Sequence, residues 1–150
     1  MKARDIMTKD VITARPEDGV EETARIMVEH KISGIPVVNE EKQLLGIVSE
    51  TDMMIRAGDL QAPFYITLFD SIIYVDNPIR YQQDVKKFSA ARIEDMMTKK
   101  VYSVDEDAEI NEIVKIMRKH NINRVPVLRH GKLVGLITRN DLLKALLRDE

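Results

Sequence analysis

The chain has 150 residues, about the length of one ordinary domain. Its 25 acidic and 23 basic residues leave a net charge of −2, which argues against a broad nucleic-acid-binding face. Because it has no cysteine, disulfides, thiolate metal sites and cysteine nucleophiles are excluded. No signal peptide is recognisable, and the longest apolar-rich stretch, at 63–75, is too short to span a bilayer. We therefore expect a soluble cytoplasmic protein that binds neither nucleic acid nor membrane.

The two halves of the chain repeat each other. Asp-Ile-Met-Thr at 5–8 matches Asp-Met-Met-Thr at 95–98, an offset of 90 positions. One extra residue in the turn at 39–43 changes the offset to 89, after which GIVSETD at 46–52 matches GLITRND at 135–141. Because chance does not preserve such spacing through a one-residue slip, we infer a duplication of about 50 residues.

Each copy shows the same order of predicted elements. A short β-branched run, at 11–13 and at 101–103, predicts the first strand. A helix follows, clearest in the second copy, where apolar residues recur at i, i+3, i+4 and i+7: Ile110, Ile113, Val114 and Met117. Two strands joined by a turn come next, at 35–38 and 44–48 in the first copy and at 125–128 and 133–137 in the second. A last helix is expected after Ser49 and after Thr138.

This order predicts an α/β (α+β) fold of two tandem units, each β-α-β-β-α, with both helices on one side of a small sheet. A unit of this size leaves one sheet face uncovered and would be marginally stable alone. We therefore expect the two sheets to pack together about a pseudo-twofold axis, which creates two related clefts. The expected domains are residues 1–58 and 92–150, separated by an insert at 59–91.

The insert holds six of the seven aromatic residues of the chain. Asp76-Asn77-Pro78 is typical of a helix start, so residues 79–90 are expected to be helical. The preceding stretch, 63–75, is too apolar to remain in solvent. The favoured interpretation is that it packs on the domain or seals a dimer interface. The alternative is a lid or a docking surface for another protein.

The duplicated phrase has the pattern Gly-x-x-Ser/Thr-x-x-Asp, with Ser49 and Asp52 in one copy and Thr138 and Asp141 in the other. One interpretation is a helix start, in which the hydroxyl caps the helix and the acid completes a capping box. A ligand site is the alternative, because capping boxes prefer glutamate and a glycine inside a strand marks close approach by a ligand or backbone. A carboxylate can also accept from both hydroxyls of a ribose, as in dinucleotide-binding folds.

An apolar slot for a base is offered by Ile35-Pro36 and by Val125-Pro126. Proline has no N–H, so it is expected where no ladder bond is needed. The preceding carbonyl and the nearby N–H groups would then be free to bind the edge of an adenine. The alternative is an ordinary proline of an edge strand.

In this order, and twice, the motifs resemble those of the cystathionine β-synthase (CBS) domain, and the pair resembles the tandem called a Bateman module. The resemblance rests on Asp-x-Met-Thr, on the Ile-Pro-Val and Val-Pro-Val triplets at 35–37 and 125–127, and on Gly-x-x-Ser/Thr-x-x-Asp. It implies a non-catalytic regulatory module that binds an adenosine compound in clefts between the copies and signals to a partner protein. It also implies a homodimer, in which two tandems form a four-domain disk.

Carried over to this chain, the resemblance assigns a role to each motif. Asp52 and Asp141 would bind ribose hydroxyls, Ser49 and Thr138 would assist, and adenine would be held by Ile35-Pro36 and Val125-Pro126, with Thr13 and Ser103 nearby. Nucleotide-binding members often carry a basic residue two positions before the proline, which here is Arg124 in one copy and Gly34 in the other. The clefts are therefore expected to be unequal, with the better phosphate site where Arg124 reaches.

The expected ligand is an adenosine nucleotide, AMP or ATP first, with S-adenosylmethionine or a dinucleotide as alternatives, and no cofactor or metal is required. An enzyme is disfavoured, because the sequence lacks a Walker-type phosphate loop and paired catalytic carboxylates. A rival of another class is a structural dimerisation module with empty clefts. For the equivalent His30 and His120, at helix ends, a structural role is favoured over a metal pair. A surface position is likewise favoured over a phosphate site for Arg139.

Overall fold

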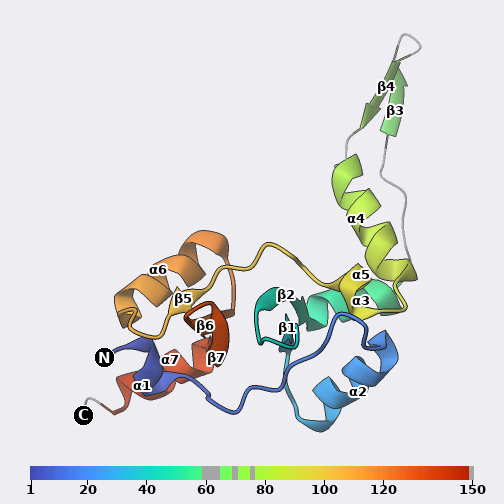
Figure 1. Cartoon of the computed structure of the whole chain (residues 1–150). Helices are drawn as coiled ribbons and strands as arrows, with labels where there is room; N and C mark the ends of the chain where they lie inside the picture. Colours follow the sequence, from blue (N-terminus) through green and yellow to red (C-terminus); the bar gives the residue numbers. More distant parts are fainter. Residues whose placement is uncertain (59–64, 69–70, 75–76, 149–150) are drawn as a thin grey trace.

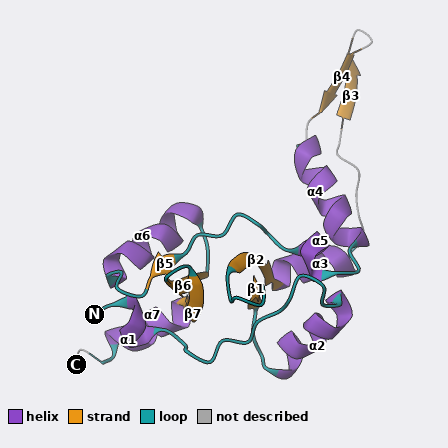
Figure 2. Ribbon diagram, in the orientation of Figure 1, coloured by secondary structure: helices purple, strands orange, loops and turns teal. Residues whose placement is uncertain are grey.

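The computed structural model describes residues 1–58, 65–68, 71–74 and 77–148 (Figure 1). The helices are α1 (Ala3–Ile6), α2 (Val20–Glu29), α3 (Glu50–Ala57), α4 (Pro78–Ser89), α5 (Ile93–Met96), α6 (Ile110–His120) and α7 (Arg139–Leu146). The strands are β1 (Gly34–Val38), β2 (Leu44–Ser49), β3 (Tyr65–Leu68), β4 (Ser71–Tyr74), β5 (Val104–Asp105), β6 (Arg124–Arg129) and β7 (Lys132–Thr138). Figure 2 shows two groups of helices and strands side by side, which confirms the predicted α/β fold of two tandem units.

Each copy is organised around an antiparallel pair of strands. β1 pairs with β2 and β6 with β7, so that the equivalent residues Gly34 and Arg124 each lie opposite the last residue of the neighbouring strand. All four strands agree with the predicted ranges to within one residue at each end. His130 and Gly131 form the turn between β6 and β7 with φ of 50° and 76°, the left-handed conformation that a tight hairpin needs.

The first strand of each copy lies later than the predicted ranges 11–13 and 101–103. In the first copy it is a parallel bridge from Ala14 to β1, and in the second it is the two-residue β5, parallel to β6. Residues 9–13 instead cross between the copies, because Thr8 is bridged to β7 of the second copy. The β-branched composition of this crossing segment suits extended backbone in general, so composition alone does not distinguish the segment from the strand that follows it.

The two copies exchange their first segments. Thr8 forms two backbone hydrogen bonds with Leu136 of β7 (2.9 and 3.0 Å), and Thr98 forms two with Ile47 of β2 (2.9 and 3.0 Å). The short helices α1 and α5, which come just before these threonines in the sequence, lie with them on the opposite copy. α1 packs in the core of the second copy and α5 in the core of the first. Each core therefore contains side chains from both halves of the sequence.

This exchange explains the glycine in each duplicated phrase. A β-carbon on Gly46 would lie 2.7 Å from Sδ of Met97 and 2.9 Å from the carbonyl oxygen of Thr98. A β-carbon on Gly135 would likewise lie 2.7 Å from Cγ of Met7. Separations below 3 Å do not fit a real side chain, so only glycine admits the exchanged methionine at these positions.

The insert forms a hairpin and a helix. β3 pairs with β4 in antiparallel register, and α4 begins where Oδ1 of Asn77 accepts a hydrogen bond from the N–H of Ile79 (3.0 Å). The helix bounds thus confirm the prediction for this segment to within one residue. α4 is anchored on α3, since Nε of Arg56 donates to the carbonyl of Ala90 (2.9 Å).

The hairpin of the insert lies beyond the far end of α4, apart from both copies (Figure 1). The described strands β3 and β4 therefore do not pack on the domain within one chain, contrary to the first of the expectations for the stretch 63–75. α4 is the physical reason, because it separates the hairpin from the copies. Residues 63–64, 69–70 and 75 of that stretch lie outside the described residues.

Candidate functional site

A cavity of about 420 Å³, called cavity 1 below, lies between the two copies. From the first copy it is lined by Ile47 of β2 and by residues 49–52, where β2 ends and α3 begins. From the second copy it is lined by residues 98 and 100–102 and by residues 121–124, which follow α6. The alternation of β2 determines this geometry, because Val48 is buried in the core whereas Ile47 faces the cavity.

A cavity of about 310 Å³, called cavity 2, is formed by the equivalent segments with the copies interchanged. It is lined by residues 31–34 of the first copy, by residues 136 and 138–140 of the second, and by residues 123 and 124. Positions 31–34 are the repeat equivalents of 121–124, and positions 138–140 are those of 49–51. The two cavities are therefore related by the pseudo-twofold symmetry of the repeat.

Both aspartates of the duplicated phrase form capping boxes. Oδ2 of Asp52 accepts hydrogen bonds from the backbone N–H (2.9 Å) and the hydroxyl (3.3 Å) of Ser49. Oδ2 of Asp141 accepts in the same way from Thr138 (2.8 and 3.0 Å). Each hydroxyl oxygen in turn accepts from the N–H of its aspartate (3.4 Å). The helix-start interpretation is thus correct for Oδ2, and a further role for these carboxylates falls to Oδ1.

The second carboxylate oxygen differs between the copies. Oδ1 of Asp52 accepts a hydrogen bond from Nζ of Lys87, which comes from α4 in the insert. Nζ of Lys87 also donates to Oγ1 of Thr98, a residue that lines cavity 1 (3.2 Å). Within the described part of the chain, no group donates to Oδ1 of Asp141. The insert therefore breaks the symmetry of the two sites at the carboxylate itself.

Arg124 lies between the two cavities and lines both. Its Nη2 donates to Oγ of Ser33 in the other copy (2.7 Å), and its guanidinium fills the space left by the missing side chain of Gly34. Burial lowers the pKa of Arg124, while the nearby carboxylates of Glu50 and Asp52 act in the opposite direction. An arginine guanidinium nevertheless remains protonated in proteins, so Arg124 presents one fixed positive charge to both cavities.

The remaining charges make the cavities unequal. Cavity 1 is lined by two acids, Glu50 and Asp52, and by two bases, Lys100 and Arg124. Cavity 2 is lined by three bases, Lys31, Arg124 and Arg139, with no acid among its lining residues. Glu50 and Arg139 are repeat equivalents, so one position accounts for much of the difference. The expectation of unequal clefts agrees with this arrangement, although Arg124 does not distinguish them.

The residues expected to hold a base lie deeper than the cavities. Ile35 and Val125 are 1% and 0% exposed, and Pro36 and Pro126 are also fully buried in β1 and β6. None of the four lines cavity 1 or cavity 2. Their immediate neighbours towards the N-terminus, residues 31–34 and 121–124, line the cavities instead.

The two residues expected beside the base are placed differently. Thr13 lines a smaller cavity of about 140 Å³, together with Lys9, Val11 and residues of β7. Ser103 is partly buried and directly follows Val101 and Tyr102, which line cavity 1. The structure thus brings Ser49, Asp52 and Arg124 together at cavity 1, and brings Thr138 and Arg124 together at cavity 2, with Asp141 next to the latter.

Tyr102 lines cavity 1 although the sequence did not predict it as a site residue. Its ring stacks on that of His120, with 3.5 Å between ring centroids and an interplanar angle of 14°, and Nζ of Lys100 lies 5.8 Å from its centroid. Position 102 corresponds to Ile12 in the first copy, so the repeat itself carried no signal for an aromatic residue here. As the one aromatic outside the insert, however, Tyr102 could have been singled out from composition.

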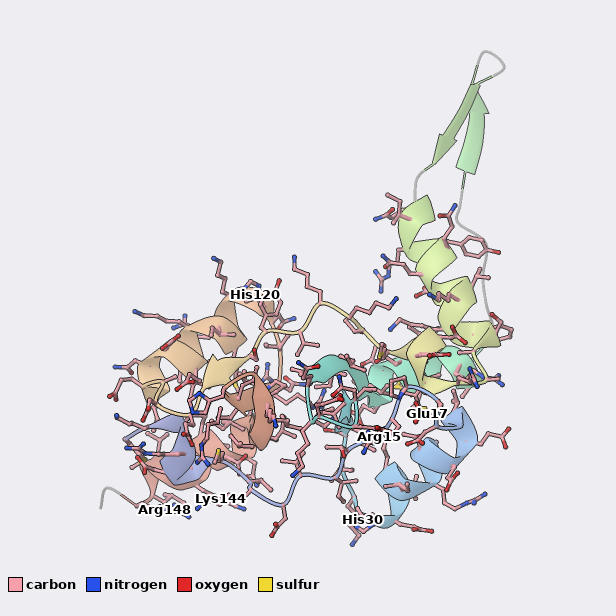
Figure 3. The ribbon with its side chains drawn as sticks, in the orientation of Figure 1. Arg15, Glu17, His30, His120, Lys144 and Arg148 are labelled. Carbon is pink, nitrogen blue, oxygen red and sulfur yellow. The ribbon has the colours of Figure 1, made fainter. Side chains whose placement is uncertain are left out.

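The equivalent histidines lie on different copies, His30 at the end of α2 and His120 at the end of α6 (Figure 3). Such separation does not suit a shared metal ion. Among residues 1–58 and 77–148, no cluster of three or more histidine or acidic side chains has the arrangement of a metal site. The helices in these ranges also include none with the length and apolar character needed to cross a membrane.

Two β-α-β-β-α units with exchanged first segments and paired cavities define a tandem domain module. The family model for the CBS domain matches residues 3–58 and 93–148, so the chain belongs to the CBS domain family. Among curated proteins it is similar to the uncharacterized protein MJ1426 of Methanocaldococcus jannaschii, with 32% identity over 98% of this chain and 92% of the relative. The resemblance proposed from the motifs is thereby confirmed.

Solved structures share the same fold. CBSX2 in complex with AMP is similar with a TM-score of 0.80 and 23% identity, covering 98% of this chain and 97% of that chain. The CBS domain pair of protein MJ0100 of Methanocaldococcus jannaschii, in complex with 5′-methylthioadenosine and S-adenosyl-L-methionine, is similar with a TM-score of 0.73 and 24% identity. This second match covers 100% of this chain and 98% of that chain. At these identities the likeness establishes the architecture.

Proposed function

We propose that the protein is a non-catalytic regulatory module that binds an adenosine nucleotide in cavities 1 and 2 and signals its occupancy to a partner protein. The observation that carries the proposal is the pair of equivalent carboxylates, Asp52 and Asp141, each at the start of a helix beside a cavity between the copies. Two structures with a similar fold are complexes with AMP and with 5′-methylthioadenosine and S-adenosyl-L-methionine, which supports the choice of an adenosine compound.

The carboxylate chemistry supports a ribose contact. Each Oδ2 is committed to its helix cap, so Oδ1 is the oxygen that would accept hydrogen bonds from ribose hydroxyls. Hydrogen bonds to a charged acceptor contribute about 1.5–3 kcal/mol each when water is excluded. At cavity 1, the apolar wall and the ring of Tyr102 would contact the base.

The charges support different preferences for the two cavities. A phosphate group carries negative charge, so the three bases at cavity 2 favour a ligand with more phosphates there. Cavity 1 has balanced charges and therefore favours AMP or an adenosine compound with little net negative charge. We accordingly propose AMP or ATP as ligands, with ATP preferring cavity 2.

A homodimer is part of the proposal. Several apolar side chains are exposed on the helices, including Val28 of α2 (77%), Met54 of α3 (70%) and Leu146 of α7 (70%). Pairing of two chains through helices would bury these side chains and build the four-domain disk expected from the family resemblance. Signalling to a separate effector protein and a cytoplasmic location are further parts of the proposal.

Calorimetry with AMP, ATP and S-adenosylmethionine tests the proposal, using Asp52→Asn and Asp141→Asn. An asparagine oxygen can still accept at the helix cap, so these variants remove the charge while keeping the helix starts. Each variant should weaken one cavity and spare the other. A ligand at a hundred times its Kd should also stabilise the protein by about 2.7 kcal/mol. If no compound binds or stabilises, the module is a structural one with empty cavities.

A further inference from the structure

Lys87 links the insert to the acid of cavity 1 through an ion pair that is largely shielded from solvent. The side chains of Lys87 and Asp52 are only 17% and 7% exposed. They are 35 positions apart in sequence, and Lys87 belongs to the segment that the repeat does not duplicate. Breaking a buried ion pair by removing one partner is costly, because it leaves the other charge unpaired. The pair therefore holds α4 against α3 as long as Oδ1 of Asp52 has no other partner.

Lys87 and a ribose would use the same oxygen. Oδ2 of Asp52 is occupied by its cap, so Oδ1 is the acceptor available to a ligand, and Lys87 donates to it. The ammonium also neutralises the charge that makes the carboxylate a strong acceptor. A ligand in cavity 1 has to replace this contact, whereas Oδ1 of Asp141 has no competitor among the described residues.

We propose that Lys87 is an internal competitor for Asp52, which makes cavity 1 the weaker site and couples its occupancy to the position of α4. The inference rests on the proposed function. Ligand fills cavity 2 first. Filling of cavity 1 displaces Lys87 from Oδ1, and α4 loosens from α3. Lys87 lies near the end of α4 that faces the copies, and the hairpin β3–β4 lies beyond the opposite end (Figure 1).

α4 is long enough to carry a displacement of Lys87 from one end of the helix to the other. Its 12 residues correspond to a length of about 18 Å, over which a helix moves as a rigid element. Besides Lys87, two hydrogen bonds hold the chain just beyond this end of the helix: Nε of Arg56 donates to the carbonyl of Ala90 (2.9 Å), and the N–H of Val20 donates to the carbonyl of Ala91 (3.1 Å). Lys87 is the anchor that lies within the helix itself, so its release lets the helix change direction about the fixed residues 90 and 91 and, with it, the position of the hairpin. The position of the insert would therefore depend on whether cavity 1 is occupied, and not on the occupancy of cavity 2.

The test uses AMP as the probe and an Asp141→Asn background, which isolates cavity 1. Lys87→Met retains the apolar stem and removes the ammonium, and it should raise the AMP affinity of cavity 1 about tenfold, or about 1.4 kcal/mol. The matched control is Lys86→Met, which changes the neighbouring, exposed lysine of the same helix and should leave the affinity unchanged. Equal AMP affinities for Lys87→Met and the parent would overturn the proposal.

Hydrogen exchange of residues 78–89 provides a readout that does not depend on binding. In ligand-free protein, Asp52→Asn should increase exchange in α4, as should Lys87→Met, whereas Lys86→Met should not. Unchanged exchange in both Asp52→Asn and Lys87→Met would show that the contact between Lys87 and Asp52 does not hold α4 in place. If AMP binds to neither cavity but exchange rises in these variants, the ion pair holds the helix and it is the proposed nucleotide function that fails. Thermal unfolding of each variant verifies that it is folded.

Discussion

Gly34 and Arg124 occupy equivalent positions of the two copies and lie against each other, so that a β-carbon on Gly34 would come within 2.7 Å of Cζ of Arg124. In this position the guanidinium reaches Ser33, with Nη2 2.7 Å from its hydroxyl oxygen. The absence of a side chain in the first copy thus seats the arginine of the second between both cavities. The two copies therefore differ at this position in packing as well as in charge.

Gly34→Ala should displace the arginine without unfolding the protein. The atoms that a β-carbon would meet belong to a flexible side chain, and alanine suits a strand, so the unfolding free energy should change by less than about 1 kcal/mol. AMP affinity, measured by calorimetry, should fall about threefold to tenfold because the phosphate contact is lost. In an Arg124→Ala background Gly34→Ala should have no further effect. Equal losses in both backgrounds would show that Gly34 acts independently of Arg124.

The exchange of first segments predicts that Ile6→Ala, a substitution in the first repeat, destabilises the second copy. Ile6 is 8% exposed and belongs to the core of the second copy, so the substitution should reduce the unfolding free energy by about 2–5 kcal/mol. Hydrogen exchange should rise most in β6 and β7, rather than in β1 and β2 of its own repeat. Ile79→Ala is the matched control, since Ile79 is 64% exposed, and it should have little effect. A loss of protection centred on β1 and β2 would contradict the exchanged arrangement.

Local chemistry explains what the sequence predicted well. The β6–β7 hairpin follows from alternating apolar residues around His130-Gly131, and α4 follows from its Asn77-Pro78 start. Both features are determined by neighbouring residues, so a single sequence suffices to find them. The starts of α3 and α7 were also predicted, because a cap depends on residues three positions apart.

What the sequence could not reveal depends on contacts between distant segments. The glycines of the duplicated phrase suggested close approach by a ligand or backbone. At Gly46 the backbone carbonyl of Thr98 does approach closely, but the exchanged methionines Met97 and Met7, which lie against the two glycines, were not foreseeable from the phrase. The pair formed by Lys87 and Asp52 was not predicted either, because the insert has no repeat equivalent to compare it with. Periodicity and spacing describe each copy separately, whereas these features arise only when the copies and the insert pack together.

The two glycines should respond differently to substitution. Gly46→Ala brings a β-carbon within 2.9 Å of the backbone oxygen of Thr98, which cannot move aside, whereas the close atoms at Gly135 all belong to Met7. Both variants should lose about 1–3 kcal/mol of unfolding free energy in urea titrations. Met7→Ala should therefore offset much of the loss in Gly135→Ala, and Met97→Ala should offset less of the loss in Gly46→Ala. Equal rescue by the two methionine substitutions would disprove the difference.

The ion pair between Glu106 and Arg129 predicts a dependence of stability on pH. Nε and Nη2 of Arg129 donate to the two carboxylate oxygens of Glu106, each at 2.6 Å. These hydrogen bonds hold the pKa of Glu106 below its ordinary value. Because the pKa is lower in the folded state, the pair stabilises above the unfolded pKa of about 4.3, and this contribution is lost as the pH falls through the folded value.

Arg129→Gln should therefore lower the melting temperature slightly at pH 7, and the difference from the unchanged protein should shrink as the pH falls below about 4. The pair lies at the surface, with Arg129 55% exposed, so the effect at neutral pH should also diminish at high salt. Thermal unfolding between pH 7 and pH 3 measures both trends. Arg92→Gln is the control for the loss of a surface arginine, since Arg92 is similarly exposed (59%) and forms one hydrogen bond with Glu94 (3.0 Å) in place of two. A difference between Arg129→Gln and the unchanged protein that stays constant across this pH range would mean that Arg129 stabilises the fold through packing of its side chain, and not through the charge of Glu106.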